Sequence, residues 1–158
     1  MTTNDEIIIM ASPDAIFRVA ADVRQWPKIL PHYRRVKVLA KGEDSLHVEM
    51  AARRGWIPVS WTAVQRCDPA GRQIHYRHTG GLTKGMTVVW EITPLSEGSR
   101  VVITHDLTLE TPIVRTWPGQ LVVAYGFVHY IASRTLRIMK RHLEQGTRVA
   151  PPSPIERR

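Results

Sequence analysis

The chain has 158 residues, of which 43% are hydrophobic and 23% are charged, and its formal net charge at pH 7 is +8. These values predict a single soluble domain with a substantial core. The basic excess favours anionic partners such as acidic lipid headgroups or phosphorylated and carboxylate ligands, although a solvated basic surface is the simpler explanation. No DNA- or RNA-binding motif occurs, so nucleic acid is not an expected partner.

The cysteine content and the first residues bear on where the protein acts. Cys67 is the single cysteine, which excludes an intrachain disulfide and a cysteine metal cluster. The N-terminus, MTTNDEIIIM, lacks the basic start and apolar run of a signal peptide. No stretch of about 18 apolar residues occurs, so we expect a cytoplasmic protein with no transmembrane segment and at most weak contact with a membrane surface.

The first thirty residues predict one strand and two helices. The apolar run at 6–10 is typical of a strand. Ser12-Pro13-Asp14 is typical of a helix start, with Ser as the N-cap and Pro in the first turn, and this helix is expected to run to about Val23. Trp26-Pro27 opens a second, short helix that Pro31 stops.

From Arg35 to Leu109 the hydrophobic period is two, which indicates strands. About six strands are joined by short turns such as 41–44, 68–71 and 96–99, so neighbouring strands should be antiparallel. One face of each strand is apolar, and the inward side is expected to include Val48, Met50, Trp61, Ala63, Gln65, Ile74, Tyr76, His78, Val88, Trp90, Ile103 and His105.

The stretch from Gln120 to Gln145 has helical periodicity and is about twice the usual helix length. Its apolar stripe consists of Leu121, Tyr125, His129, Ala132, Leu136, Met139 and Leu143. Because two members of this stripe have polar tips, the helix is expected to close over a partly hollow interior. Residues 147–158 carry three prolines and several basic residues and are expected to form a flexible tail.

This order of elements, of class α+β, resembles the START-like or Bet v 1-like superfamily. The Ser12-Pro13-Asp14 helix start and the stretch Asp22-Val23-Arg24-Gln25 before Trp26-Pro27 make the chain most similar to the polyketide cyclase/dehydrase and coenzyme Q-binding group. The resemblance covers about residues 5–145 and implies one ligand-binding domain over 1–146. It implies a helix-grip fold, in which a seven-stranded curved antiparallel sheet wraps around the long C-terminal helix and two short helices follow the first strand.

Three places resemble the aromatase/cyclase members of this group. Trp26 followed by Tyr33 resembles their aromatic pair, and Thr104-His105-Asp106 resembles a strand motif whose histidine faces the cavity. A strand motif Trp-x-Ser-x-Arg, whose arginine anchors or polarises the polyketide, has its best match at 61–65, with Gln65 in the arginine position. Arg66, one step further, faces away by strict alternation unless a bulge turns it inward.

The candidate catalytic residues are His105, Tyr125 and His129, which can exchange protons with a poly-β-ketone during aldol cyclisation. The structural alternatives are a core histidine for His105 and a polar pocket rim for the other two. The candidate ligand-binding residues are Trp26, Tyr33, Trp61, Gln65, Arg66, Tyr76, His78 and Trp90, although inward aromatic residues often serve packing alone. We expect Trp61, Trp90, His105, Tyr125 and His129 to line one internal pocket of roughly several hundred cubic ångströms.

Two functions remain open at this point. The first is a cyclase or aromatase acting on a hydrophobic, ring-containing ligand, free or bound to a carrier protein. The second is a non-catalytic carrier or chaperone for a lipid or quinone, which the missing arginine at Gln65 favours. No cofactor is expected, because no glycine loop has a nucleotide-binding context. No metal is expected either, because no HxH or HExxH spacing occurs.

Overall fold

The computed structural model describes residues 1–110 and 117–147; in the second range, the side chains at 117, 120, 121, 124, 125 and 147 are not described. The elements are, in chain order, β1 (Thr2–Ile9), α1 (Pro13–Ala21), the 3-10 turn η1 (Val23–Gln25), α2 (Trp26–Ile29), β2 (Tyr33–Lys41), β3 (Leu46–Arg54), β4 (Ile57–Asp68), β5 (Gln73–Gly81), β6 (Thr87–Pro94), β7 (Ser99–Asp106), α3 (Trp117–Val123), the π-helical turn η2 (Ala124–Val128) and α4 (His129–Thr147).

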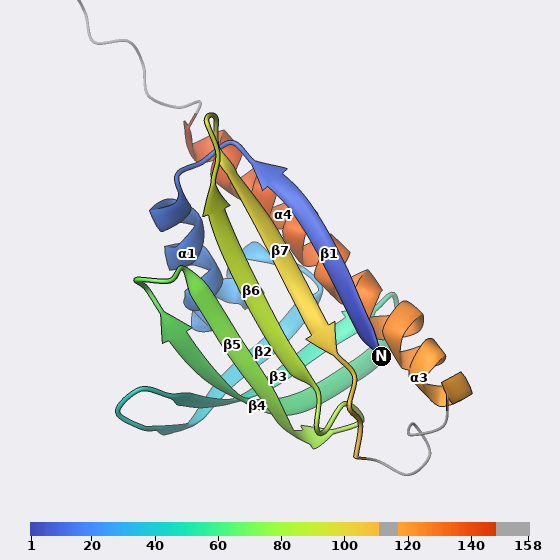
Figure 1. The fold of residues 1–158 in the computed structure, drawn as a ribbon. Helices are drawn as coiled ribbons and strands as arrows, with labels where there is room; N and C mark the ends of the chain where they lie inside the picture. The colour runs from blue at the N-terminus through green and yellow to red at the C-terminus, as the bar shows by residue number, and fades with distance from the viewer. Residues whose placement is uncertain (111–116, 148–158) are drawn as a thin grey trace, which may run out of the picture.

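The seven strands form one antiparallel sheet in the order β1-β7-β6-β5-β4-β3-β2. The sheet curves, and α4 lies across its concave side while α1 and α2 cover one end (Figure 1). The predicted helix-grip architecture is therefore confirmed. The first strand is longer than its apolar run, because β1 begins at Thr2 and pairs with β7 along its whole length.

Alternating side chains place the core between the sheet and α4. The apolar faces predicted from the sequence are the buried ones, including Val48, Met50, Ile74, Trp90 and Ile103. Leu136 and Met139 of α4 complete the core. Burial of apolar surface at about 25 cal/mol per Å² is the main stabilising term for such a contact.

The long helical segment is not uniform, which corrects the expectation of one helix with period 3.6. A π-helical turn, Ala124–Val128, separates α3 from α4. A π turn holds more residues than an α turn and shifts the side chains before it around the axis. Ala132, Leu136 and Met139 of the predicted stripe are buried, but at the turn Val128 is buried and His129 is exposed.

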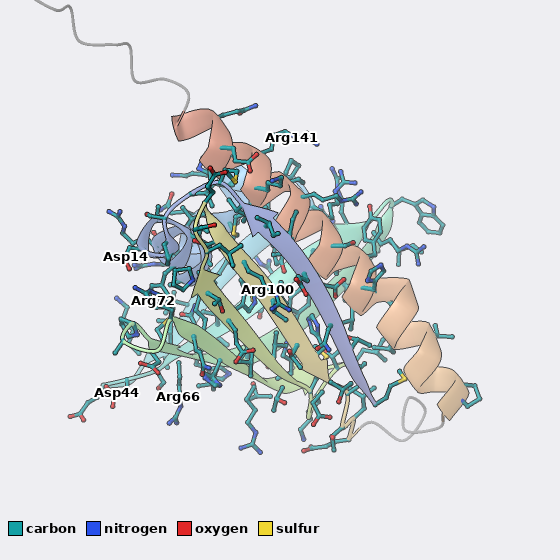
Figure 2. All side chains as sticks on the ribbon, turned by 45° about the horizontal axis from the view of Figure 1, so that its top comes forward. Asp14, Asp44, Arg66, Arg72, Arg100 and Arg141 are labelled. Carbon is teal, nitrogen blue, oxygen red and sulfur yellow. The ribbon has the colours of Figure 1, made fainter. Side chains whose placement is uncertain are left out.

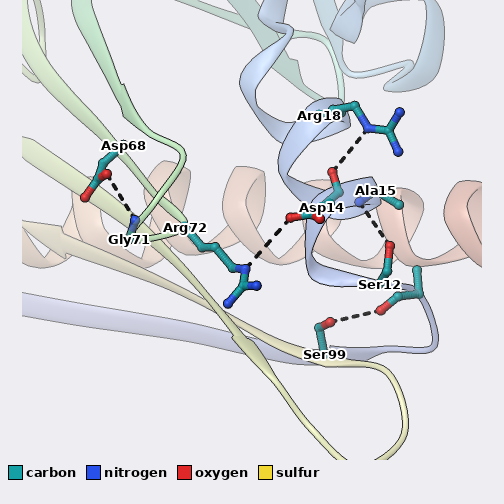
Figure 3. A network of polar contacts seen from close by, with 9 residues as sticks. Ser12, Asp14, Ala15, Arg18, Asp68, Gly71, Arg72 and Ser99 are labelled. Carbon is teal, nitrogen blue, oxygen red and sulfur yellow. Dashed lines mark hydrogen bonds and ion pairs between the residues drawn. The ribbon is translucent and has the colours of Figure 1, made fainter.

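The predicted N-cap of α1 is confirmed. The Ser12 Oγ accepts a hydrogen bond from the backbone N–H of Ala15 at 3.2 Å, and Pro13 stands at the first helical position (Figure 3). The buried Ser99 hydroxyl on β7 donates to the Ala11 carbonyl at 2.9 Å, which ties the helix start to the sheet. The helix was predicted to end at about Val23, but α1 ends at Ala21 and the η1 turn follows.

The surface is mostly polar, and arginines project from both the sheet and α4 (Figure 2). Across residues 1–110 and 117–147, no helix has the length and apolar character needed to cross a bilayer. Of the expected tail, Thr147 belongs to α4 and residues 148–158 lie outside the described part of the chain.

Replacing the N-cap tests the start of α1. Ser12→Ala is expected to lower the free energy of unfolding by about 1 kcal/mol, because the Ala15 N–H loses its acceptor. Ser12→Asp keeps an acceptor and should stay close to the wild type. Urea unfolding followed by circular dichroism measures both variants, and an unchanged midpoint for Ser12→Ala would contradict the cap.

Candidate functional site

An internal cavity of about 80 Å³ lies between the concave face of the sheet and the helices η2 and α4. Seven of the predicted site residues line it: Trp26, Tyr33, Trp61, Tyr76, His78, Trp90 and His105. Val128, Ala132 and Thr135 close it from the helix side. Trp61, Trp90 and His105 therefore share a pocket as predicted, but His129 is not among its lining residues, and the volume is well below the expected several hundred cubic ångströms.

Aromatic packing explains the small volume. The Trp26 ring lies at the centre of a cluster, with its centroid 5.0 Å from Tyr33 in an edge-to-face contact and 5.7 Å from Trp90. The Trp26 Nε1–H donates to the Val19 carbonyl at 3.2 Å, so α1 fixes this ring in place. These rings fill one end of the space and form an aromatic, apolar wall that suits a hydrophobic ligand.

The opposite end of the cavity is polar and contains two histidines. His78 stacks on Trp61 with the ring planes 7° apart, and its Nδ1 lies 2.7 Å from the Thr83 Oγ1. His105 comes from β7, and its Nδ1 is buried without a hydrogen-bond partner among the described residues. An unpartnered buried polar atom is rare in native proteins and needs an explanation.

Both histidines are held in the neutral form. Burial lowers the pKa of His105 to about 4. Burial and, to a smaller extent, the neighbouring His105 lower the pKa of His78 to about 3, since two imidazolium ions repel each other in this space. At neutral pH each ring therefore offers one N–H donor and one nitrogen acceptor.

Thr83 was not predicted from the sequence. It lies in the loop between β5 and β6, where Gly81 and Gly85 have φ values of +89° and +95°. A Cβ at Gly85 would lie 2.5 Å from the Thr108 carbonyl oxygen, so this tight loop requires glycine there. The glycines mark a sharp turn in the sequence, but the inward direction of Thr83 depends on the folded loop.

A third buried histidine, His32, was also missed. Its Nε2 lies 2.9 Å from the Thr135 Oγ1, and Thr135 donates its own proton to the Ile131 carbonyl at 2.7 Å. Burial lowers the pKa of His32 to about 4, and Arg134 contributes. His32 follows Pro31 outside any periodic segment, so no pattern pointed to it.

Gln65 and Arg66 do not contribute to the cavity wall. Gln65 faces inward, as expected, but its amide donates to the Ala21 carbonyl at 2.9 Å and to the Tyr76 hydroxyl at 3.0 Å. Arg66 is exposed on the outer face, where it points away from α4 (Figure 2). The idea that a bulge turns Arg66 inward is wrong, because β4 has no bulge at this point and strict alternation holds.

The expectation that His129 faces the cavity is also wrong. Its side chain is 57% exposed, and its Nδ1 lies 2.6 Å from the Asp5 Oδ1 on the edge strand β1. The Asp5 carboxyl is only 4% exposed, and burial raises its pKa although His129 acts in the opposite direction. Tyr125 belongs to η2, but its side chain lies outside the described part of the structure.

Within the described residues, no group of three His, Cys, Asp or Glu side chains is placed to hold a metal ion. The site thus offers apolar and aromatic walls, two neutral imidazoles, and the hydroxyls of Tyr33, Tyr76, Thr83 and Thr135. The curved seven-stranded sheet closed by a long helix, with a cavity between them, defines a helix-grip protein.

Comparison with known proteins places the chain more narrowly. Residues 9–125 match the family described as polyketide cyclase / dehydrase and lipid transport, so the chain belongs to this family. The granaticin polyketide synthase bifunctional cyclase/dehydratase of Streptomyces violaceoruber is 26% identical over 106 residues, which cover 65% of this chain and 33% of the relative. A putative polyketide cyclase of Streptomyces cyaneus is 23% identical over 114 residues, which cover 68% of this chain and 73% of the relative.

Solved structures show the same fold. TTHA0849 from Thermus thermophilus has a TM-score of 0.77 at 19% identity, covering 93% of this chain and 99% of its own. The Zhui aromatase/cyclase from Streptomyces sp. R1128 has a TM-score of 0.72 at 22% identity, covering 92% and 98%. A START superfamily protein from Mycobacterium smegmatis has a TM-score of 0.72 at 15% identity, covering 91% and 97%. The chain spans only about a third of the bifunctional cyclase/dehydratase, so that protein's activity does not transfer directly.

The neutral histidines predict a specific acid sensitivity. His32, His78 and His105 have pKa values lowered from 6.5 to about 4, 3 and 4, so below pH 6.5 the unfolded chain binds protons that the folded chain does not. Stability from these groups is complete above pH 6.5 and falls as the pH drops toward 4 and 3. For each histidine, the free energy of unfolding should fall by about 2 kcal/mol as the pH drops from 6.5 to 5. Urea unfolding at a series of pH values should give a smaller loss in His105→Phe than in the wild type; equal losses would contradict the lowered pKa.

The His129–Asp5 contact predicts a structural role for His129. His129→Ala should lower the free energy of unfolding at pH 7 by about 1 kcal/mol, because the buried Asp5 carboxylate loses its partner. The effect is modest because the His129 side chain is half-exposed. The difference from the wild type should shrink at low pH as Asp5 becomes protonated, and it should shrink when Asp5→Asn is combined with His129→Ala. Thermal unfolding measures both effects, and a loss that ignores pH and the second substitution would argue against this pair.

Proposed function

We propose that the protein binds a hydrophobic, ring-forming poly-β-ketone in its internal cavity and catalyses aldol cyclisation followed by loss of water. One observation carries the proposal: His78 and His105 are both buried and neutral at the polar end of an otherwise apolar and aromatic cavity. Membership in the polyketide cyclase/dehydrase family supports the same substrate class. The proposal covers a ketone that is free and one that is bound to a carrier protein.

The proposed chemistry uses the two imidazoles in different roles. His105 accepts a proton from the methylene between two carbonyl groups, and the resulting enolate carbon attacks a ketone carbon further along the chain. The N–H of His78, whose ring is held by Thr83 and Trp61, hydrogen-bonds to the ketone oxygen that becomes an alkoxide. His105 then returns its proton, and the β-hydroxy ketone loses water to give a conjugated ring.

The low pKa values limit this base but do not disable it. A free imidazole with a pKa near 4 is too weak to deprotonate a diketone in water. Inside the cavity, the developing enolate stabilises the imidazolium beside it, because opposite charges attract strongly where water is excluded. A neutral imidazole is also a competent hydrogen-bond donor to a carbonyl oxygen. Tyr125, in the π turn, remains a further candidate for proton transfer.

A second function, a non-catalytic lipid or quinone carrier, rests on Gln65. The aromatase/cyclase motif has an arginine at this position, and here the neutral amide NH2 donates to Ala21 and Tyr76. The described lining residues include no fixed cation, which is the strongest group for polarising a ketone. A carrier needs only the apolar walls.

Replacing His105 separates these functions. In His105→Phe, cyclisation of a synthetic poly-β-ketone thioester should fall by at least about 100-fold, the usual contribution of general acid–base catalysis. Folding should be retained or improved, because the His105 Nδ1 has no described partner and an aromatic volume is kept. Turnover by chromatography and melting temperature are measured together at pH 7.5.

His129→Gln is the matched control and should retain turnover, since His129 lies outside the cavity. A wild type that binds an aromatic probe in the cavity and never turns over the ketone would favour the carrier. A His105→Phe variant that loses stability but not turnover would assign His105 to the core and contradict its catalytic role.

A further inference from the structure

The tip of the β3–β4 hairpin carries an unusually exposed aromatic side chain. Trp56 is 89% exposed, the highest value among the large hydrophobic residues described. The two-residue loop Gly55-Trp56 joins the strands, and Gly55 has a φ of +60° with open space around it. Ile57 beside it is also exposed. Nothing in the fold requires a tryptophan at this position.

The apolar tip continues onto α3. Val122 is 64% exposed. Its Cγ1 and the Arg54 Nη1 both lie within 4 Å of the point where a Cβ at Gly126 would stand, so the hairpin and α3 meet there. The hairpin reaches past the start of α4 at this corner of the molecule (Figure 1).

The same corner is cationic and contains no carboxylate. Neither residues 50–67 nor residues 117–143 include a single Asp or Glu. Arg54 donates to the Gly126 carbonyl at 2.6 Å and lies over the Tyr130 ring, which Arg134 also faces. Arg53 is exposed, and within the described residues none of these three arginines pairs with a carboxylate.

We propose that this corner, Arg53–Ile57 with Val122, docks on the surface of an anionic lipid bilayer. Tryptophan prefers the boundary between headgroups and acyl chains, and arginines beside it attract anionic headgroups. The tip is a narrow protrusion, which enters a soft bilayer readily. A rigid protein partner would need a matching pocket and a contact of roughly 800 Å² per side to bind stably.

The docking surface borders the cavity. Val59 and Trp61 follow the tip on β4 and line the cavity, and Phe127 and Val128 follow Gly126 on the π turn and line it as well. A bilayer bound at the tip therefore faces the side of the cavity that β4 and η2 form. An apolar ligand or product can pass between the two with little exposure to water.

Vesicle co-sedimentation tests the proposal on the full-length protein and requires no turnover, so its outcome is independent of the cyclase proposal. The protein should sediment with vesicles of phosphatidylcholine and phosphatidylglycerol, and not with phosphatidylcholine alone. Trp56→Ser and Arg53→Glu should each weaken binding by about tenfold. High salt should weaken it as well.

Two matched variants serve as controls. Arg66→Glu makes the same charge change on the outer face, and Leu39→Ser removes an exposed apolar side chain from β2; both should bind like the wild type, and melting temperatures verify folding. Equal loss in Arg53→Glu and Arg66→Glu would mean diffuse attraction and would overturn the proposal. Absence of binding to the anionic vesicles would also overturn it. If, in that case, Trp56→Ser lost turnover of a carrier-bound substrate, the tip would be assigned to binding an acidic protein.

Discussion

The structure depends on the burial of one helix face against the concave side of the sheet. Leu136, Met139 and Ile103 exclude water from this interface, and every polar group placed there must remain neutral or find a partner. His78 and His105 follow this rule, since burial holds both in the neutral form. The same dry environment that stabilises the fold thus sets the protonation state of the groups that the cavity offers to a ligand.

The π turn between α3 and α4 determines which side chains face this interior. By adding residues to one turn, it buries Val128 and exposes His129, which then binds the edge-strand residue Asp5. The Gly126 carbonyl of the turn accepts a hydrogen bond from Arg54, so the tip of the β3–β4 hairpin is fixed to the helix at this irregularity. The cavity lining, the sheet edge and the exposed Trp56 corner are therefore linked through the π turn and His129 directly after it.

The sequence predicted the sheet well because strand alternation is local. From Val48 to His105, the period of two alone decides which side chains face inward. The Ser12 cap likewise depends only on neighbouring residues. Predictions failed where the answer depends on distant contacts. His129 was misplaced because a π turn has no clear pattern in a single sequence, and Thr83 and His32 were missed because loop residues acquire their burial only from the fold. The volume was overestimated because the close fit of Trp26, Tyr33 and Trp90 depends on their rotamers.

The cavity volume constrains how the proposed ligand can enter. A cavity of about 80 Å³ is smaller than the roughly 300–1,000 Å³ of small-molecule sites, so a multi-ring ligand must displace side chains. The Trp26 cluster resists displacement, since α1 fixes the central ring through the Val19 carbonyl. The wall formed by η2 is weaker, because its π geometry is less stable than an α turn and the contact from Arg54 reaches solvent. Only molecules with an open wall can bind, so the apparent affinity is the intrinsic affinity multiplied by the fraction of open molecules. Conditions that lower the free energy of opening therefore also favour binding.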